Sequence, residues 1–145
     1  MASIVALNIS EKKGIAKHTI EKGYFKVDYG LLGDVHAGSG ARQVSLLGQE
    51  SIDKINKLKI KGFCNAKFVE NITSEGVVFH ELSVGKNLKI GEVILEITQI
   101  GKECYQGCKI KIRNSTGTCA MSKEVIFARV LRDGWIKSGD EIQLL

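Results

Sequence analysis

Short runs of alternating hydrophobic and polar residues, separated by glycines, make up most of the chain. Residues 93–100 show the alternation best, because Val93, Leu95 and Ile97 occupy every second position, as in a strand with one buried face. Similar patterns predict strands at residues 3–9, 43–47, 68–72, 76–79, 87–90, 109–113, 125–131 and 141–145. The chain is therefore predicted to be mainly β, folded as a meander or a β-barrel.

One segment has a helical period instead. From Gly48 onward, Ile52, Ile55 and Leu58 recur three residues apart, and lysines between them suit the solvent side of a helix. We expect one major helix here, with short additional helical segments elsewhere. Residues 10–40 sustain neither period, and a stretch of that length in a compact domain typically carries function or covers a sheet edge.

The composition fits one folded domain spanning residues 1–145. Hydrophobic residues make up 43% and charged residues 26%, which excludes a disordered or collagen-like chain. The 16 glycines and the absence of proline indicate that glycines set the turns. No apolar run approaches the ~18 residues of a membrane helix, and the start does not resemble a secretory signal, so we expect a cytoplasmic protein without a membrane partner.

The charge is mildly basic, with 21 Lys and Arg against 16 Asp and Glu. The basic run 109–113 and the lysines between residues 54 and 67 lack interleaved aromatic side chains, so they are typical of solvated faces, and nucleic-acid binding is not expected. In a reducing compartment, the four cysteines are more naturally thiols, metal ligands or redox groups than a disulfide framework.

The first chemical candidate is the glycine-bracketed stretch at residues 33–38, which contains Asp34 and His36 and is followed by Arg42. Glycines let the backbone turn sharply near a ligand, and a guanidinium offers a planar fork for a carboxylate or phosphate. Such a loop suits an anion. A surface turn in which Asp34 caps a backbone amide and His36 is incidental explains the pattern equally well.

The second candidate lies at residues 101–108, after an apolar strand. Lys102 stands two residues before Cys104, and a nearby cation favours the thiolate, the form that attacks and that binds metals. Cys108 and Cys119 follow, and three thiolates could hold a soft metal or form a transient disulfide. The spacing matches no strong zinc pattern, and buried structural cysteines remain the alternative, most of all for Cys64.

The third candidate is the pair Glu70 and Asn71, which interrupts an apolar run. Asn71 can donate and accept hydrogen bonds to a ligand, whereas capping an adjacent turn is its more common role. The residues alone leave both roles open.

Taken together, these segments resemble the MOSC domain, named for the C-terminal domain of molybdenum-cofactor sulfurases, in its short stand-alone bacterial form. The resemblance rests on motifs in order along nearly the whole chain: Gly-Asp-Val-His-Ala-Gly at 33–38, Arg-Gln-Val-Ser-Leu-Leu at 42–47, Glu-Asn-Ile-Thr-Ser-Glu-Gly at 70–76, the run 98–104 and Ile-Phe-Ala-Arg-Val-Leu at 126–131.

The resemblance implies a β-barrel-like fold in which Cys104 is the hallmark residue, carrying sulfur as a persulfide or binding molybdenum. Cys108 and Cys119 become candidate additional metal ligands. The motif positions that would line a pocket for the molybdenum cofactor (molybdopterin) are His36, Arg42, Glu70, Asn71, Lys102 and Arg129. Close relatives often have histidine after the hallmark cysteine, whereas this chain has Tyr105, which removes one candidate base beside the thiol.

The leading functional prediction is a sulfur carrier or cofactor-binding domain that delivers sulfur to a metal centre through Cys104. Its donor would be an external cysteine desulfurase or another sulfur donor, and its acceptor a molybdenum-cofactor enzyme or metal–sulfur centre. Two alternatives are a small molybdenum-pterin oxidoreductase that reduces N-hydroxylated compounds, and a non-catalytic three-cysteine metal-binding module. No lysine context supports a Schiff base, so pyridoxal phosphate is not expected.

Overall fold

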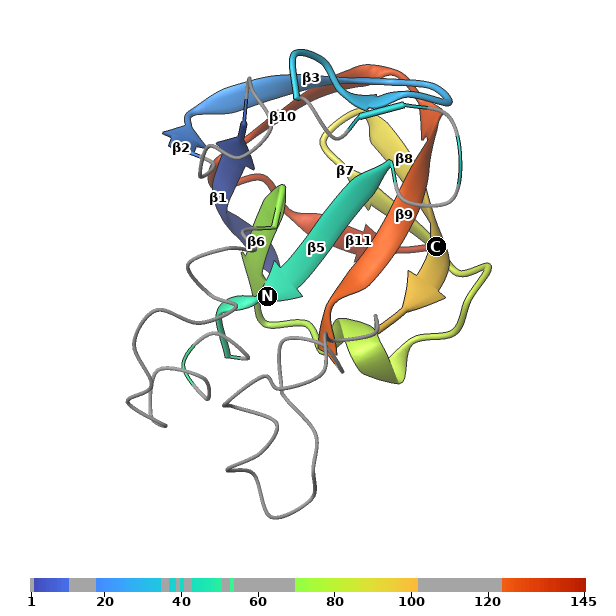
Figure 1. The fold of residues 1–145 in the computed structure, drawn as a ribbon. Coiled ribbons are helices and arrows are strands. Elements are labelled where there is room, and N and C mark those ends of the chain that lie inside the picture. Colours follow the sequence, from blue (N-terminus) through green and yellow to red (C-terminus); the bar gives the residue numbers. More distant parts are fainter. Residues whose placement is uncertain are drawn as a thin grey trace, which may run out of the picture.

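The computed structural model describes residues 2–10, 18–34, 37–38, 40, 43–50, 53, 70–101 and 124–145. These residues form a mainly β structure (Figure 1). Its elements are β1 (Ser3–Ile9), β2 (His18–Ile20), β3 (Lys22–Lys26), β4 (Gly30–Leu31), β5 (Val44–Gly48), β6 (Ile72–Glu75), the short 3-10 helix η1 (Phe79–Glu81), β7 (Asn87–Ile90), β8 (Val93–Ile100), β9 (Ile126–Arg132), β10 (Gly134–Lys137) and β11 (Ile142–Leu144).

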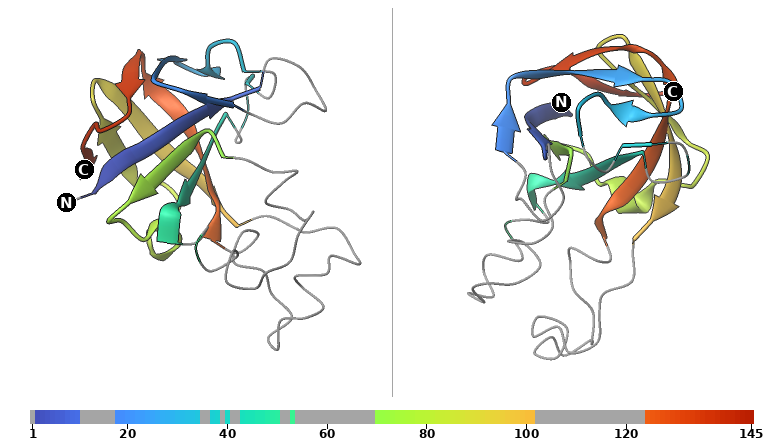
Figure 2. Two further views of the ribbon diagram at one scale, coloured as in Figure 1. Left: turned by 90° about the vertical axis from the view of Figure 1, so that its left-hand side faces the viewer. Right: turned by 45° about the horizontal axis from the view of Figure 1, so that its top comes forward.

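Two sheets organise these strands. The larger has the order β11-β7-β8-β9-β5-β6-β1-β2 and is antiparallel except for the β5–β6 pair. The smaller has the order β10-β3-β4. Figures 1 and 2 show the larger sheet strongly curled, with β3 and β10 lying across one end of it.

The predicted barrel is not closed within the described part of the chain. One edge of β1 pairs with β6. On the other edge, Leu7–Ile9 pair with β2, so only the start of β1 is left to meet β11. There, a single bridge joins Ser3 to Glu141, supported by the Ile4 amide donating to the Asp140 carbonyl at 2.9 Å. The mainly β prediction is confirmed, and the closed barrel is wrong because β2 occupies the edge that closure would need.

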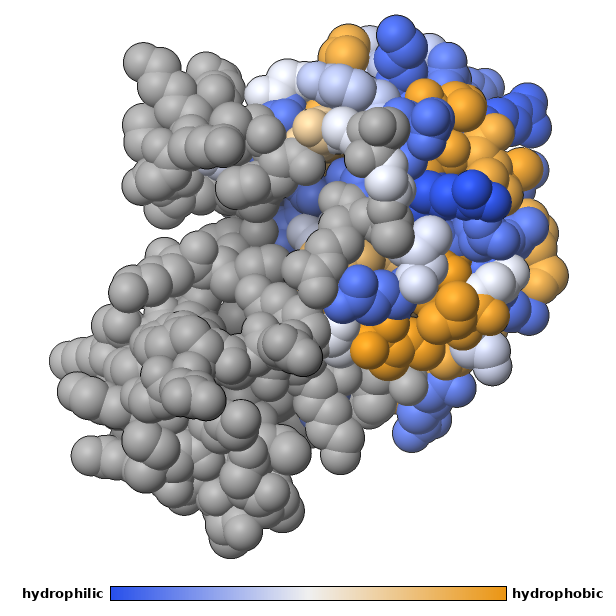
Figure 3. Space-filling view, turned by 45° about the vertical axis from the view of Figure 1, so that its right-hand side comes forward, coloured by the Kyte–Doolittle hydropathy of each residue, from blue (hydrophilic) through white to orange (hydrophobic). Residues whose placement is uncertain are grey.

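The concave side of the curled sheet holds the hydrophobic core. The alternation in β8 is confirmed, since Val93, Leu95 and Ile97 are fully buried in it. Leu46 of β5 and Phe25 of β3 belong to the same cluster, so both sheets share one core. Exposed hydrophobic residues lie in separate groups among hydrophilic ones in the view of Figure 3.

The predicted strands at residues 3–9, 43–47, 87–90, 93–100, 125–131 and 141–145 are confirmed to within a residue or two. The strand predicted at 76–79 is wrong, because Gly76 turns the chain with a positive φ of 81° and η1 follows. The strand predicted at 68–72 is described only from Glu70, and β6 begins at its end. The strand predicted at 109–113 lies outside the described residues.

The major helix predicted from Gly48 is not supported. Gln49, Glu50 and Asp53 have helical backbone, the other residues of that segment lie outside the described residues, and η1 is the only helix with defined ends in the described ranges. None of the helical structure in those ranges has the length and apolar character needed to cross a membrane.

Candidate functional site

The face of the larger sheet that points away from the core carries a group of buried polar residues. Alternation along β5 sends Val44 and Leu46 into the core and Ser45 to the opposite face. Six buried polar residues meet on or beside this second face, and we call them the polar junction: Asn8, Asp34, Ser45, Glu70, Asn71 and Thr73.

Asn71 is the centre of the polar junction. Its side-chain oxygen accepts from the Ser45 amide at 3.0 Å and from the Ser45 hydroxyl at 3.1 Å. Its side-chain nitrogen donates to the Asn8 carbonyl and to Asp34 Oδ2, both at 3.3 Å. An asparagine amide has two donors and two acceptor sites, so all four are used. Asn71 therefore holds neighbouring strands together, and a ligand would have to displace one of these bonds.

Asp34 connects the motif at residues 33–38 to the motif at residues 70–76. Its carboxylate accepts from the Ser10 amide at 2.9 Å and from Asn71, although the two motifs lie 37 residues apart. The Ala37 amide donates to the Asp34 carbonyl at 3.1 Å, and the Gly38 amide donates to the Tyr29 carbonyl at 2.7 Å. The predicted capping of a backbone amide is present, but on a carboxylate that is only 3% exposed and not on a surface turn.

Glu70 is buried beside Asn71. The Thr73 hydroxyl donates to its carboxylate. The Asn8 side-chain nitrogen donates to the Glu70 carbonyl at 2.9 Å and to Thr73 Oγ1 at 3.3 Å. The motif at residues 70–76 is thus bound to β1 through both backbone and side-chain hydrogen bonds.

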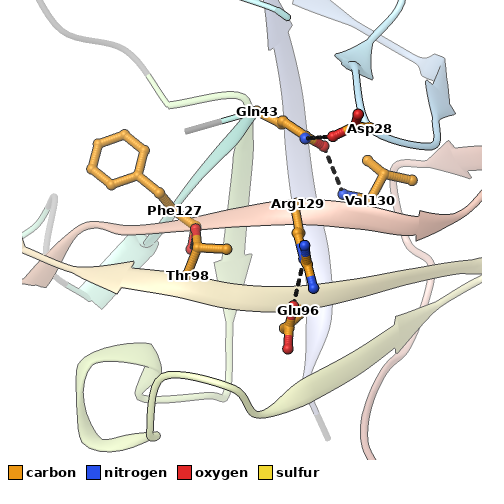
Figure 4. A network of polar contacts seen from close by, with 7 residues as sticks. All are labelled: Asp28, Gln43, Glu96, Thr98, Phe127, Arg129 and Val130. Carbon is orange, nitrogen blue, oxygen red and sulfur yellow. Dashed lines mark hydrogen bonds and ion pairs between the residues drawn. The ribbon is translucent and has the colours of Figure 1, made fainter. Parts of the chain in front are cut away.

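Arg129 lies on the same outward face, farther along β9. Ser45 pairs with Phe127, and Arg129 is two residues beyond it, so the strand period places both on one side of the sheet. Arg129 Nε lies 2.5 Å from Glu96 Oε1 of β8, and the arginine side chain is 50% exposed (Figure 4). The pair borders a groove of about 350 Å³ lined by Asp28, Gly40, Val84, Gly85, Glu96, Ile97, Thr98 and Arg129.

Gln43 is a positioning residue that the sequence interpretation missed. Its side chain is buried, accepts from the Val130 amide at 2.9 Å and donates to Asp28 Oδ1 at 2.9 Å (Figure 4). Gln43 therefore fixes the backbone next to Arg129. Its place in the motif directly after Arg42 was the available signal, but a lone glutamine in a strand pattern does not reveal a partner 87 residues away.

The other predicted site residues lie outside the described residues: His36, Arg42, Lys102, Cys104, Cys108 and Cys119. Among the described residues next to these positions, Gly101 follows β8 and donates its amide to the Val125 carbonyl at 2.6 Å. Within the described ranges, no three His, Cys, Asp or Glu side chains are grouped to hold a metal ion.

Comparison with known families supplies the next step. Residues 33–143 match the family described as the MOSC domain, which is most of the chain. The chain belongs to the MOSC domain family. The family resemblance expected from the motifs is thereby confirmed. MOSC domains are associated with molybdenum-cofactor-related functions.

Solved structures with this MOSC fold include the YuaD protein of Bacillus subtilis, with a TM-score of 0.75 and 19% identity, covering 98% of this chain and 94% of that one. YiiM of Geobacillus stearothermophilus gives a TM-score of 0.70 at 17% identity, covering 100% and 75% of the two chains. YiiM of Escherichia coli gives 0.67 at 18%, covering 100% and 70%. Identities this low show the shared fold alone. The comparison with curated proteins gives no match.

The described residues that line this groove include three charged side chains. Arg129 is the cationic one among them, and Glu96 pairs with it. Asp28 adds a second carboxylate to the described lining. In this MOSC domain, the described residues organise the sheet face and do not themselves form an anion site.

Proposed function

We propose that this MOSC domain is a sulfur carrier that accepts sulfane sulfur on Cys104 and passes it to an acceptor in molybdenum-cofactor-related metabolism. The observation that carries the proposal is the family match over residues 33–143, a range that includes Cys104. The polar junction supports the proposal, because a hydrogen bond of 3.3 Å joins Asp34 of the motif at residues 33–38 to Asn71 of the motif at residues 70–76.

The transfer step needs no external oxidant or reductant. The Cys104 thiolate attacks the terminal sulfur of a donor persulfide, a new S–S bond forms, and the donor's S–S bond breaks to release the donor cysteine as a thiolate. The same exchange, run with an acceptor thiolate, returns Cys104 to its starting state. Lys102, two residues before Cys104, favours the thiolate that both directions require.

The strand pair β8–β9 suits a carrier. At one end of this pair, the Gly101 amide donates to the Val125 carbonyl at 2.6 Å. Cys104 follows Gly101 by three residues in the sequence. In Figure 1, this end lies away from β3 and β10. A donor or acceptor that approaches it meets the end of a long antiparallel pair.

Intact-mass spectrometry under non-reducing conditions tests the proposal. Wild type, Cys104→Ala and Cys64→Ala are each incubated with cysteine and a cysteine desulfurase. Cys64 has no counterpart in the family motifs and serves as the matched thiol control. We expect labile addition of one sulfur atom to wild type and to Cys64→Ala, and none to Cys104→Ala.

Equal loading of Cys104→Ala and wild type would refute the assignment, as would the absence of loading in wild type. In the latter case, metal analysis separates the two alternatives. Bound molybdenum with turnover of an N-hydroxylated compound indicates the oxidoreductase. Stoichiometric zinc without turnover indicates the three-cysteine module.

A further inference from the structure

The outer side of the smaller sheet carries aromatic and basic side chains in alternation. Along β3 and β10, Gly23, Phe25, Gly134 and Ile136 are buried, and the residues between them face outward. We call these outward residues the aromatic–lysine face: Lys22, Tyr24, Lys26, Trp135 and Lys137.

The two aromatic residues form a pair at the centre of this face. Trp135 is opposite Tyr24 in the β10–β3 register, with ring centroids 5.4 Å apart and an interplanar angle of 75°. Lys22 Nζ lies 5.2 Å from the centroid of the Trp135 ring. Trp135 is nonetheless 53% exposed. Tyr and Trp each combine a large apolar ring with a polar group, and they are enriched at interfaces.

The charge around the pair is positive. Lys22 and Lys137 are opposite each other on one side of the aromatic pair, and Lys26 lies two residues beyond Tyr24 on the other side. None of the three lysines has an ion pair with another described residue. Asp133 adds one carboxylate beside the face, where it accepts from the Val27 amide at 2.5 Å and from the Tyr24 hydroxyl at 3.4 Å, so the three lysines leave an excess of two positive charges. The face therefore presents unpaired cations on both sides of exposed rings.

This chemistry selects among partners. A second copy of the chain would bring lysines against lysines in a two-fold contact, which is repulsive. A small molecule needs a concave site, and the described groove that Arg129 borders is built on β8 and β9, not on this sheet. An extended polyanion with planar rings meets both demands, because its charges reach the lysines while its rings stack on the aromatics.

We propose that the aromatic–lysine face binds single-stranded nucleic acid, with a base stacked on Trp135 and phosphates held by Lys22, Lys26 and Lys137. The site lies across the end of the molecule opposite to the point where residues 102–123 leave the sheet (Figure 1). It is thus independent of sulfur transfer. The sequence alone did not suggest it because Tyr24 and Trp135 lie 111 residues apart and meet only through the β3–β10 pairing.

The chain supplies its own probe, since Trp135 is its single tryptophan. Titration of wild type with a short oligothymidylate should quench the tryptophan fluorescence in a saturable way. Three phosphate contacts on a single strand predict a slope of about −2 in a plot of log affinity against log salt concentration. A fourfold rise in salt should therefore weaken binding by about 20-fold.

Variants separate charge from stacking. The double variant Lys22→Ala/Lys137→Ala should reduce the salt slope to about −0.7, whereas Lys86→Ala/Lys89→Ala, which removes the same charge near the other sheet, should leave it unchanged. Trp135→Ala, followed by anisotropy of a labelled oligothymidylate, should weaken binding by about 5- to 100-fold.

Three outcomes overturn the proposal. The first is no binding of oligothymidylate by wild type at low salt. The second is equal binding of polyglutamate, which would assign the face to an acidic protein. The third is binding of anionic phospholipid vesicles without binding of the oligonucleotide, which would assign it to a membrane surface.

Discussion

Replacement of Asn71 by alanine should be among the most destabilising single changes in the described part of the chain. The substitution removes four buried hydrogen bonds, of which one is to the Asp34 carboxylate, and leaves the Ser45 amide and the Asn8 carbonyl without this partner. Neutral bonds contribute about 1 kcal/mol each and a bond to a charged group about twice that. The expected loss is therefore about 5 kcal/mol in the free energy of unfolding.

Urea unfolding followed by circular dichroism measures this loss. A loss of that size should also lower Tm by about 15 °C in a domain of this length. Asn87→Ala is the matched control, because Asn87 lies on β7 and its side chain makes no hydrogen bond to another described residue. The control should change the free energy of unfolding by less than about 0.5 kcal/mol. A loss below about 1 kcal/mol for Asn71→Ala would refute the stabilising role assigned to the polar junction.

A second substitution at the same position adds a pH signature. Asn71→Asp keeps the shape but places a carboxyl about where the side-chain nitrogen now lies, 3.3 Å from Asp34 Oδ2. Two carboxylates at so short a distance share a proton. The folded state therefore raises the pKa of the pair above the unfolded value near 4. The variant's deficit should therefore be smallest at low pH and grow as the pH rises through that raised pKa. A deficit that does not vary with pH would contradict the predicted contact.

Two further predictions concern the strands that frame the site. Gly30→Ala should destabilise the fold by about 1–3 kcal/mol, because Gly30 has a φ of +113° and an added Cβ would collide with the Gln43 carbonyl oxygen. Thermal unfolding measures this loss, and an unchanged Tm would contradict the close approach of Gly30 to Gln43. Partial burial, and then the Asp133 carboxylate, raises the pKa of Tyr24 above 10.0, so its phenol should keep its proton to higher pH than an ordinary tyrosine. Asp133→Asn should lower that pKa, as read from absorbance during an alkaline titration; an unchanged pKa would exclude Asp133 as a cause.

The sequence predicted the strands whose alternation is set by one buried face. β8 is the clearest case, because its buried residues Val93, Leu95 and Ile97 alternate with partly exposed positions. β3 and β10 were missed because their buried positions include Gly23 and Gly134, which carry no hydrophobic signal. The alternation of hydrophobic and polar residues does not reveal a buried strand position that is occupied by glycine.

The site was predictable to the extent that its residues fall in contiguous motifs. Glu70, Asn71 and Asp34 were singled out, but their mutual contacts depend on strand pairing between β1, β5 and β6, which no local pattern encodes. Arg129 was assigned to an anionic ligand on its motif position. Its pairing with Glu96 depends on the β8–β9 register, which shifts at two places along the pair. Tertiary register therefore decides what a motif residue can bind.

The bond between the Gly101 amide and the Val125 carbonyl closes one end of the β8–β9 pair. The two strands are paired from Ile94 and Arg132 at one end to Ile100 and Ile126 at the other. The entropy of closing a longer segment grows slowly, by about 0.6 kcal/mol for each doubling of length. The entropic cost of bringing β8 and β9 together therefore depends only weakly on the number of residues that connect them.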